Sequence, residues 1–171
     1  FMFTILGRSS PIDTDLGSFI TSGVMPYLAF RFQVNALLRV KSTYRHVVLL
    51  PALEYRTVYF AIAMLEFCNA LMIYMVLIFG NYLLTGEFEI HNLMQWFIGF
   101  SLASLAGASA GYAVSANMRR ADAASRLMSV VLRPLFYITP IFYVAAELPN
   151  DLIWIIFWNP LLHAIEFLRE G

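Results

Sequence analysis

Long apolar stretches separated by short polar segments run along the whole chain. Several of these stretches carry few charges and reach the roughly 20 residues that a helix needs to cross a bilayer. They do not alternate residue by residue between apolar and polar positions, so a barrel of transmembrane strands is excluded. The pattern predicts the outgoing end of one span at 1–7, further spans at 16–38, 57–84 and 93–118, and a fifth that begins at 127.

The last quarter of the chain departs from this regular pattern. The fifth apolar stretch ends at Glu147, and the next one is interrupted at Asn159 and Pro160. Asparagine followed by proline is typical of an N-cap and the first residue of a helix. We therefore predict two short helices, 151–158 and 160–169, that enter the membrane from one side without crossing it.

Basic residues fall in alternate connecting segments. Segment 39–56 holds four Lys or Arg residues and segment 119–126 holds three, whereas 8–15 and the tail after 147 hold one each and 85–91 holds none. Positively charged loops of membrane proteins stay on the cytoplasmic side. We therefore place the two basic segments in the cytoplasm and the interrupted tail on the outer side.

Composition agrees with a membrane protein. Hydrophobic residues make up 60% of the chain and charged residues 13%, whereas soluble domains carry about twice as many charges. The formal net charge is zero, so the basic field that nucleic-acid binding needs is missing. The single cysteine, Cys68, lies in an apolar stretch and predicts neither a disulfide nor a metal site. The fold class is an all-α polytopic membrane protein.

Three charged residues, Arg31, Glu66 and Arg133, lie within the predicted spans. Charges at such positions are costly and usually face a partner or a water-filled cavity. The two arginines lie toward cytoplasmic ends, so snorkelling to the interface and lining a transport pathway both remain open. Glu66 lies deeper in its span, where an ion pair with an arginine of a neighbouring span is the favoured interpretation.

The span 93–118 carries small residues at steps of four, which places them on one helix face. They are Gly99, Ala103, Gly107, Gly111 and Ser115. Small residues allow two helix backbones to approach closely inside a membrane. The pattern favours packing within the chain over a contact between subunits, and neither role is catalytic.

The basic segment 39–56 mixes charges with apolar residues, which predicts a short amphipathic helix at the cytoplasmic surface. Such a helix can rest on anionic membrane lipid, which the pattern favours, or dock on a soluble partner. The chain contains no glycine-rich phosphate loop and no nucleophile arrangement. Any ATP chemistry therefore has to come from a partner.

Three stretches carry a resemblance to a known family: TSGVMPYLAF at 21–30, LRPLFYITPIFY at 132–143 and WNPLLHAIEFLREG at 158–171. They resemble the start of the second span, the proline-containing fifth span and the tail of the membrane subunit of ABC-2 type exporters. More narrowly, the chain is similar to the capsular polysaccharide export branch. The first and third stretches are shared with exporters of O-antigen, teichoic acid and lipo-oligosaccharide.

The resemblance implies a single transmembrane domain over 1–171 that would lack the start of its first span and a sixth span. It implies a homodimer around a continuous channel in the bacterial inner membrane, with two ATP-binding cassette subunits docked below. ATP and magnesium would be bound by those subunits, and this chain would be a permease without a cofactor or catalytic residues. The cargo would be a lipid-linked capsular polysaccharide.

The resemblance also assigns residues to three regions. A coupling helix at 39–53 would contact the ATPase through Arg39, Lys41, Tyr44 and Arg45. Candidates for contact with the cargo in the channel are Tyr27, Phe30, Arg31, Tyr55, Tyr59, Glu66 and Arg133. The two short outer helices would form a lid at the periplasmic exit, with Trp154, Trp158, Asn159, Pro160, His163, Glu166 and Arg169.

Three other interpretations are open. A permease of the same family could carry O-antigen, teichoic acid, lipo-oligosaccharide or a drug. An intramembrane enzyme could use His163 with Glu166, or His91 with Glu87 and Glu89, although a surface hydrogen bond is the commoner use of such a pair. A structural membrane protein would have no ATPase partner.

Overall fold

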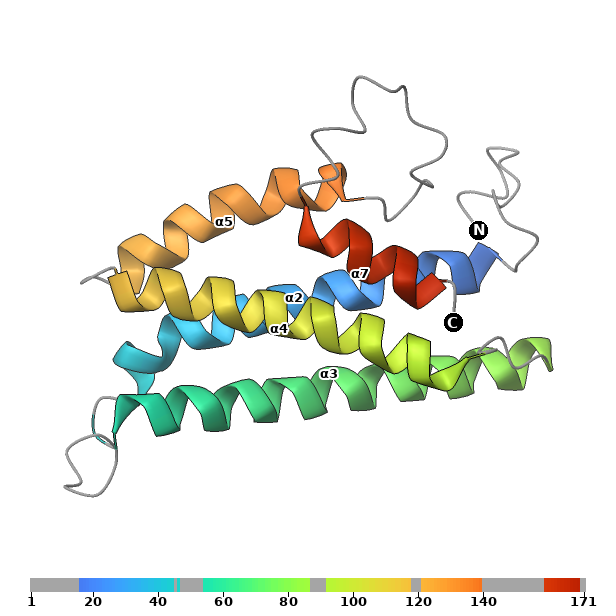
Figure 1. Cartoon of the computed structure of the whole chain (residues 1–171), viewed down its shortest axis with the longest axis horizontal. Helices are drawn as coiled ribbons and strands as arrows, with labels where there is room; N and C mark the ends of the chain where they lie inside the picture. The colour runs from blue at the N-terminus through green and yellow to red at the C-terminus, as the bar shows by residue number, and fades with distance from the viewer. Residues whose placement is uncertain are drawn as a thin grey trace.

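The computed structural model describes residues 16–44, 46, 54–86, 92–117, 121–139 and 159–169. This part of the chain contains five helices: α2 (Leu16–Thr43), α3 (Tyr55–Thr85), α4 (Leu93–Asn117), α5 (Ala121–Ile138) and α7 (Pro160–Arg169). The long helices lie side by side along the longest axis of the molecule, and the shorter α7 lies near one end (Figure 1).

Consecutive helices from α2 to α5 run in opposite directions (Figure 1). The ends of α2 and α4 and the starts of α3 and α5 therefore lie at one end of the structure. Four basic residues lie within six residues of the helix termini at this end: Arg39, Lys41, Arg56 and Arg126. The helix directions thus bring the two basic segments to the same side, as the alternation of charges along the chain predicted.

Several predicted elements agree closely with the helices. α3 and α4 correspond to the spans predicted at 57–84 and 93–118, and α7 has the bounds predicted for the second short helix. The first short helix, predicted at 151–158, lies outside the described residues, as does most of the predicted coupling helix, 47–53. These two elements stay predictions.

Two predicted boundaries are wrong. α2 does not end at 38 but continues to Thr43, because Val40 is fully buried against α3 and Lys41 reaches the end of α4. The predicted coupling helix therefore cannot begin at 39. α5 begins at Ala121, ahead of the predicted start of the fifth span, because this alanine-rich segment has high helix propensity.

α2 lies at the centre of the bundle and contacts α3, α4, α5 and α7. Phe30, Val34 and Leu38 follow one another at helical spacing and are buried in a cluster that includes residues of α4, α5 and α7. On another face of α2, the Gln33 side-chain amide donates a hydrogen bond of 2.9 Å to the Ala63 carbonyl of α3. These contacts use most of the α2 surface for packing.

The small-residue stripe of α4 packs within the chain, which confirms the favoured interpretation. A Cβ atom on Gly107 would lie 2.8 Å from the Phe30 Cα of α2, and one on Gly111 would lie 3.0 Å from the Val34 Cα. A Cβ atom on Gly99 would lie 2.8 Å from the Ala164 carbonyl of α7. α4 thus touches the backbones of two other helices through the same face.

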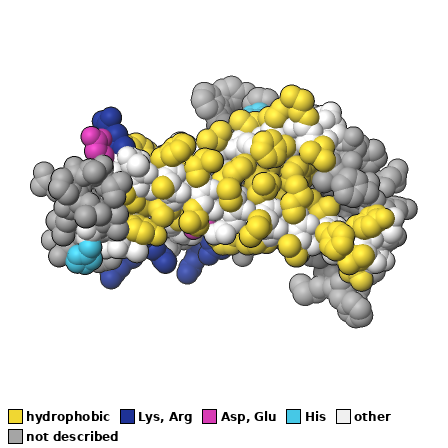
Figure 2. Space-filling model, turned by 90° about the horizontal axis from the view of Figure 1, so that it is seen from below, with side chains coloured by type: hydrophobic (Ala, Val, Ile, Leu, Met, Phe, Trp, Pro, Cys, Tyr) yellow, Lys and Arg dark blue, Asp and Glu magenta, His cyan; other side chains and the backbone are white. Residues whose placement is uncertain are grey.

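The outer surface of α3 is apolar. Large side chains such as Phe60, Val76 and Leu83 are 68–70% exposed, and many hydrophobic side chains gather over the middle of the face seen in Figure 2. Among the described helices, α3 and α4 are long and apolar enough to cross a membrane. α3 has 31 residues, or about 46 Å, so it exceeds the hydrocarbon core of roughly 30 Å and has to tilt or protrude.

The contact between α4 and α2 predicts a position-specific effect of added volume. Gly107→Val should destabilise the protein by about 1–3 kcal/mol, because the new side chain meets the α2 backbone, which cannot give way as a flexible side chain can. Gly80→Val is the matched control, since a Cβ atom at Gly80 has no neighbour within 4 Å. Thermal unfolding in detergent measures both changes, and equal melting temperatures for the two variants would contradict the packing argument.

Candidate functional site

A cavity of about 270 Å³ lies between α2 and α5. α2 contributes Tyr27, Arg31 and Asn35, which follow one another at steps of four and so share one helix face. α5 contributes Ser129, Leu132, Arg133 and Phe136, which share a face of that helix in the same way. The cavity is therefore the space between one face of each helix.

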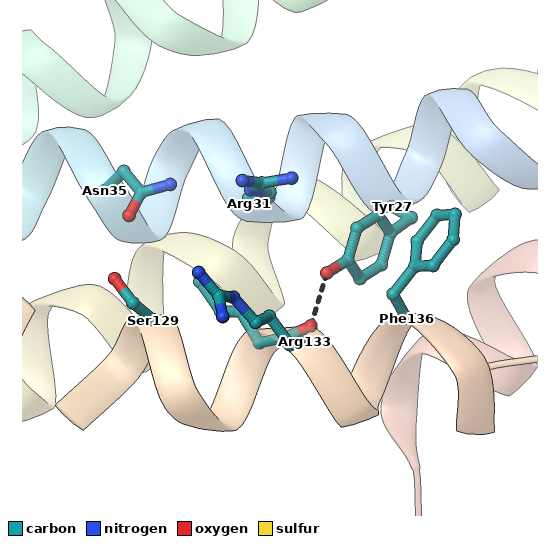
Figure 3. Close-up of a pocket in the computed structure, with 7 residues that line it drawn as sticks. Tyr27, Arg31, Asn35, Ser129, Arg133 and Phe136 are labelled. Atoms are coloured by element: carbon teal, nitrogen blue, oxygen red, sulfur yellow. Dashed lines mark hydrogen bonds between the residues drawn. The ribbon is translucent and has the colours of Figure 1, made fainter. Parts of the chain in front are cut away.

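Because α2 and α5 run in opposite directions, the lining residues are ordered along the cavity (Figure 3). Asn35 and Ser129 lie at one end, Arg31 and Arg133 in the middle, and the rings of Tyr27 and Phe136 at the other. The polar end is the one nearer the basic end of the bundle.

Tyr27 braces the two helices at the aromatic end of the cavity. Its hydroxyl donates a buried hydrogen bond of 2.6 Å to the Leu132 carbonyl of α5. Its ring meets the ring of Phe136 edge-on, with centroids 5.0 Å apart. Tyr27 is 2% exposed, so its position is set by packing as well as by the hydrogen bond.

The two arginines give the cavity its charge. Arg31 and Arg133 are both exposed, and neither makes an ion pair or hydrogen bond with another described residue. At 1.5 Å per residue, each lies about 18 Å along its helix from the basic end of the bundle. Their side chains line the cavity between the helices. Snorkelling to the interface and lining a transport pathway both stay predictions.

The remaining channel candidates lie elsewhere. Phe30 and Tyr59 are each 6% exposed and belong to packed clusters, and the Tyr59 hydroxyl shares a hydrogen bond of 2.5 Å with the Ser115 hydroxyl. Tyr55 is exposed at the start of α3. Glu66 is partly buried on α3 and has no basic partner among the described residues, so the expected ion pair is not found there.

Sequence reasoning singled out Tyr27, Arg31 and Arg133 but missed Asn35, Ser129 and Phe136 as their neighbours. The signal was present in the spacing, because residues three or four apart share a helix face. Without knowing which faces of α2 and α5 meet, however, this spacing applies equally to residues that face lipid.

The predicted coupling residues have different surroundings. Arg39 is exposed, and Arg45 lies outside the described residues. Tyr44 is partly buried beside a small hydrophobic cluster that joins α2 to α3. The Lys41 ammonium donates hydrogen bonds to the carbonyls of Ser115 and Ala116, the latter at 3.4 Å. A cation at this place satisfies carbonyls that the end of α4 leaves without helical partners, so Lys41 has a structural contact within the chain.

The start of α7 is fixed by Asn159, as the sequence predicted. The Asn159 side-chain oxygen accepts a hydrogen bond of 3.1 Å from the Leu161 amide, the geometry of an N-cap. Its side-chain nitrogen donates to the Thr139 hydroxyl at 3.2 Å, and that hydroxyl donates to the Leu135 carbonyl at 2.6 Å. One side chain thus caps α7 and ties it to the end of α5.

The other predicted lid residues are distributed around α7. Pro160 and His163 are exposed, Glu166 is partly buried, and Trp154 and Trp158 lie outside the described residues. The Arg169 side chain donates a hydrogen bond of 3.4 Å to the Ser22 hydroxyl of α2. Burial lowers the pKa of Arg169 to about 10, so the side chain remains charged at neutral pH.

No group of three or more His, Cys, Asp or Glu side chains among the described residues could hold a metal ion. The alternative set of His91, Glu87 and Glu89 lies outside the described residues.

Residues 2–171 match the sequence model of the family described as ABC-2 type transporter. This chain belongs to the ABC-2 type transporter family. Together with the apolar surfaces of α3 and α4, membership of this family makes the chain a membrane protein.

Two curated relatives are both called polysialic acid transport protein KpsM and come from Escherichia coli. One is 23% identical over 172 residues, and the other is 22% identical over 167 residues. Each alignment covers 98% of this chain and 64% of the relative, so the chain spans just under two thirds of the length of these two relatives.

The brace at the cavity leads to a stability prediction. Tyr27→Phe keeps the ring and its contact with Phe136 but leaves the Leu132 carbonyl without the tyrosine hydroxyl. The loss should lower the free energy of unfolding by about 1 kcal/mol. Tyr112→Phe is the control, because Tyr112 is exposed and its hydroxyl makes no hydrogen bond with the described residues. Thermal unfolding of both variants in detergent tests the difference. An unchanged melting temperature for Tyr27→Phe would show that the hydrogen bond to the Leu132 carbonyl does not stabilise the protein.

Proposed function

We propose that this chain is part of the transmembrane subunit of an ATP-driven exporter that moves a lipid-linked polysaccharide from the cytoplasm to the periplasm. The cavity between α2 and α5 carries this proposal, because it gathers hydrogen-bond donors, cations and aromatic rings in a protein whose surface is otherwise largely apolar. The printed name of the two relatives, polysialic acid transport protein, supports a polysaccharide as the cargo.

The chemistry of the cavity suits a sugar chain. Aromatic rings pack against the apolar faces of sugar rings, while amide, hydroxyl and guanidinium groups donate hydrogen bonds to the oxygens at their edges. Tyr27 and Phe136 supply the rings at one end, and Asn35 and Ser129 supply polar groups at the other. We place this cavity along a channel that two copies of the subunit form together in the bacterial inner membrane.

ATP hydrolysis is assigned to a separate ATP-binding cassette subunit, since the sequence contains no phosphate-binding loop. This partner docks at the basic end of the bundle, on Arg39 and the segment that follows α2. α2 is one continuous helix from this end to the cavity. Movement of the docked subunits is therefore transmitted along α2 to Tyr27, and through its hydrogen bond to α5.

α7 and the segment before it form the outer lid in this proposal. α7 packs against α4 and α2 at the end of the bundle opposite the basic end. Its link through Asn159 to Thr139 connects the lid to the end of α5. A shift of α5 that opens the cavity would thus reach the lid through the same side chain.

The docking role of Arg39 is tested by charge reversal. Arg39→Glu should weaken binding of the ATP-binding cassette subunit by at least about 10-fold. A partner surface that complements Arg39 is acidic, and it would repel the glutamate. Co-purification and ATP-driven export are the measurements. Lys41→Met is the comparison variant, and it should lower thermal stability through loss of the α4 contact. Normal complex formation and export by Arg39→Glu would remove this residue from the docking surface.

The orientation is tested by thiol labelling of intact cells. In a Cys68→Ser background, Asn92→Cys should react with a membrane-impermeant maleimide, whereas His46→Cys should react only after the cells are opened. Both positions are exposed at opposite ends of the bundle, and the charge pattern places His46 in the cytoplasm. The reverse labelling pattern would invert the proposed direction of transport.

A further inference from the structure

We propose that the cavity between α2 and α5 is an anion site in which Arg31 and Arg133 together hold one carboxylate or phosphate group of the exported molecule. This inference rests on the proposed export function, which supplies the identity of the cargo. It adds that the cargo carries a negative charge. An exporter with this site would select an acidic glycan or a glycan with a phosphate-bearing anchor.

The first argument is the missing counter-ion. Two guanidinium groups that cannot lose their charge line one cavity of about 270 Å³. Neither is paired with a described carboxylate, and the described residues that line the cavity include no Asp or Glu. Cations within a membrane-spanning bundle normally have a partner or face a water-filled path. An anion held between them would supply that partner.

The second argument is the order of groups along the cavity. Asn35 and Ser129 lie on the polar side of the arginine pair, and Tyr27 and Phe136 lie on its aromatic side (Figure 3). An acidic sugar presents the same combination, with an anionic group beside a ring that has an apolar face. Guanidinium binds carboxylate and phosphate oxygens with two parallel hydrogen bonds, and both arginines of the proposed site line the same cavity.

The third argument is size. Pockets for drug-sized ligands usually measure about 300–1,000 Å³, and this cavity, at about 270 Å³, lies just below that range. It suits one charged group with the ring or headgroup that bears it, and not several repeating units at once. A polymer with regularly spaced acids would therefore occupy the site one charge at a time.

The test uses the complex with its ATP-binding cassette subunit in phosphatidylcholine nanodiscs. Three probes are compared: an oligomer of sialic acid, phosphatidylglycerol added to the nanodiscs, and neutral maltoheptaose. Probe binding is measured for the wild type, R31Q, R133Q and the control R126Q, whose position on α5 is exposed outside the cavity. Stimulation of ATP hydrolysis is measured for the wild type, R31Q and R133Q only, because Arg126 lies at the basic end where the ATP-binding cassette subunit is proposed to dock.

At least one anionic probe should bind more tightly than maltoheptaose, and its binding should weaken as salt is added. R31Q and R133Q should each weaken binding of that probe about 10-fold, the loss expected for one charge-assisted contact, while R126Q should not. R31K and R133K should recover part of the affinity, because they restore the charge without the planar fork.

The pattern of responses identifies the source of the anion. A response to the sialic acid oligomer assigns the site to a carboxylate on the glycan, and a response to phosphatidylglycerol assigns it to a phosphate on the anchor. Equal binding of maltoheptaose and both anions to the wild type, or unchanged binding by R31Q and R133Q, would overturn the inference. Because the three probes are compared on the wild type, equal binding would overturn the inference even where a variant fails to fold.

Failure of the proposed function gives a different result. An absence of ATPase association, with salt-sensitive anion binding still abolished by R31Q, would refute the exporter and leave the anion site in place. ATP-driven export of neutral and acidic glycans alike, unaffected by R31Q and R133Q, would leave the exporter and refute the anion site.

Discussion

The close approach of the α4 backbone to α2 is the constraint on which the rest of this structure depends. At Gly107 no space remains for a side chain, since a Cβ atom would meet the α2 backbone, and at Gly111 a Cβ atom would lie only 3.0 Å from the Val34 Cα. Lipid tails are as apolar as leucine, so helices in a membrane associate through such close packing rather than through the hydrophobic effect. With α4 on one side of α2 and α3 on another, a limited face is left for α5. That face carries Tyr27, Arg31 and Asn35.

The contacts of α2 differ in kind along its length. Toward the basic end, Lys41 satisfies the last carbonyls of α4, and Val40 is fully buried. In the middle, Gln33 binds an α3 carbonyl on one side while Arg31 faces the cavity on another. With these neighbours, α2 is one continuous helix from Leu16 to Thr43.

Elements that depend on local sequence were predictable. Asn159 and Pro160 predict the start of α7, because an N-cap side chain binds backbone amides only two or three residues further along the chain. Small residues at steps of four identified the packing face of α4, and the structure places that face inside the chain. Boundaries failed where a distant contact extends a helix: nothing near Leu38 in the sequence indicates that Lys41 will meet the end of α4 and that α2 will continue to Thr43.

The sequence by itself determined that the chain is a set of long apolar helices, which way successive helices run and which residues carry charge within them. These properties follow from hydrophobic length, helical period and the distribution of Lys and Arg, all of which are read locally. Only the tertiary structure decided that Arg31 and Arg133 share a cavity, that Tyr27 braces α2 to α5 and that Phe30 and Tyr59 are buried. The physical reason is that a helical period fixes which residues share a face, whereas the rotation and register of two packed helices fix which faces meet.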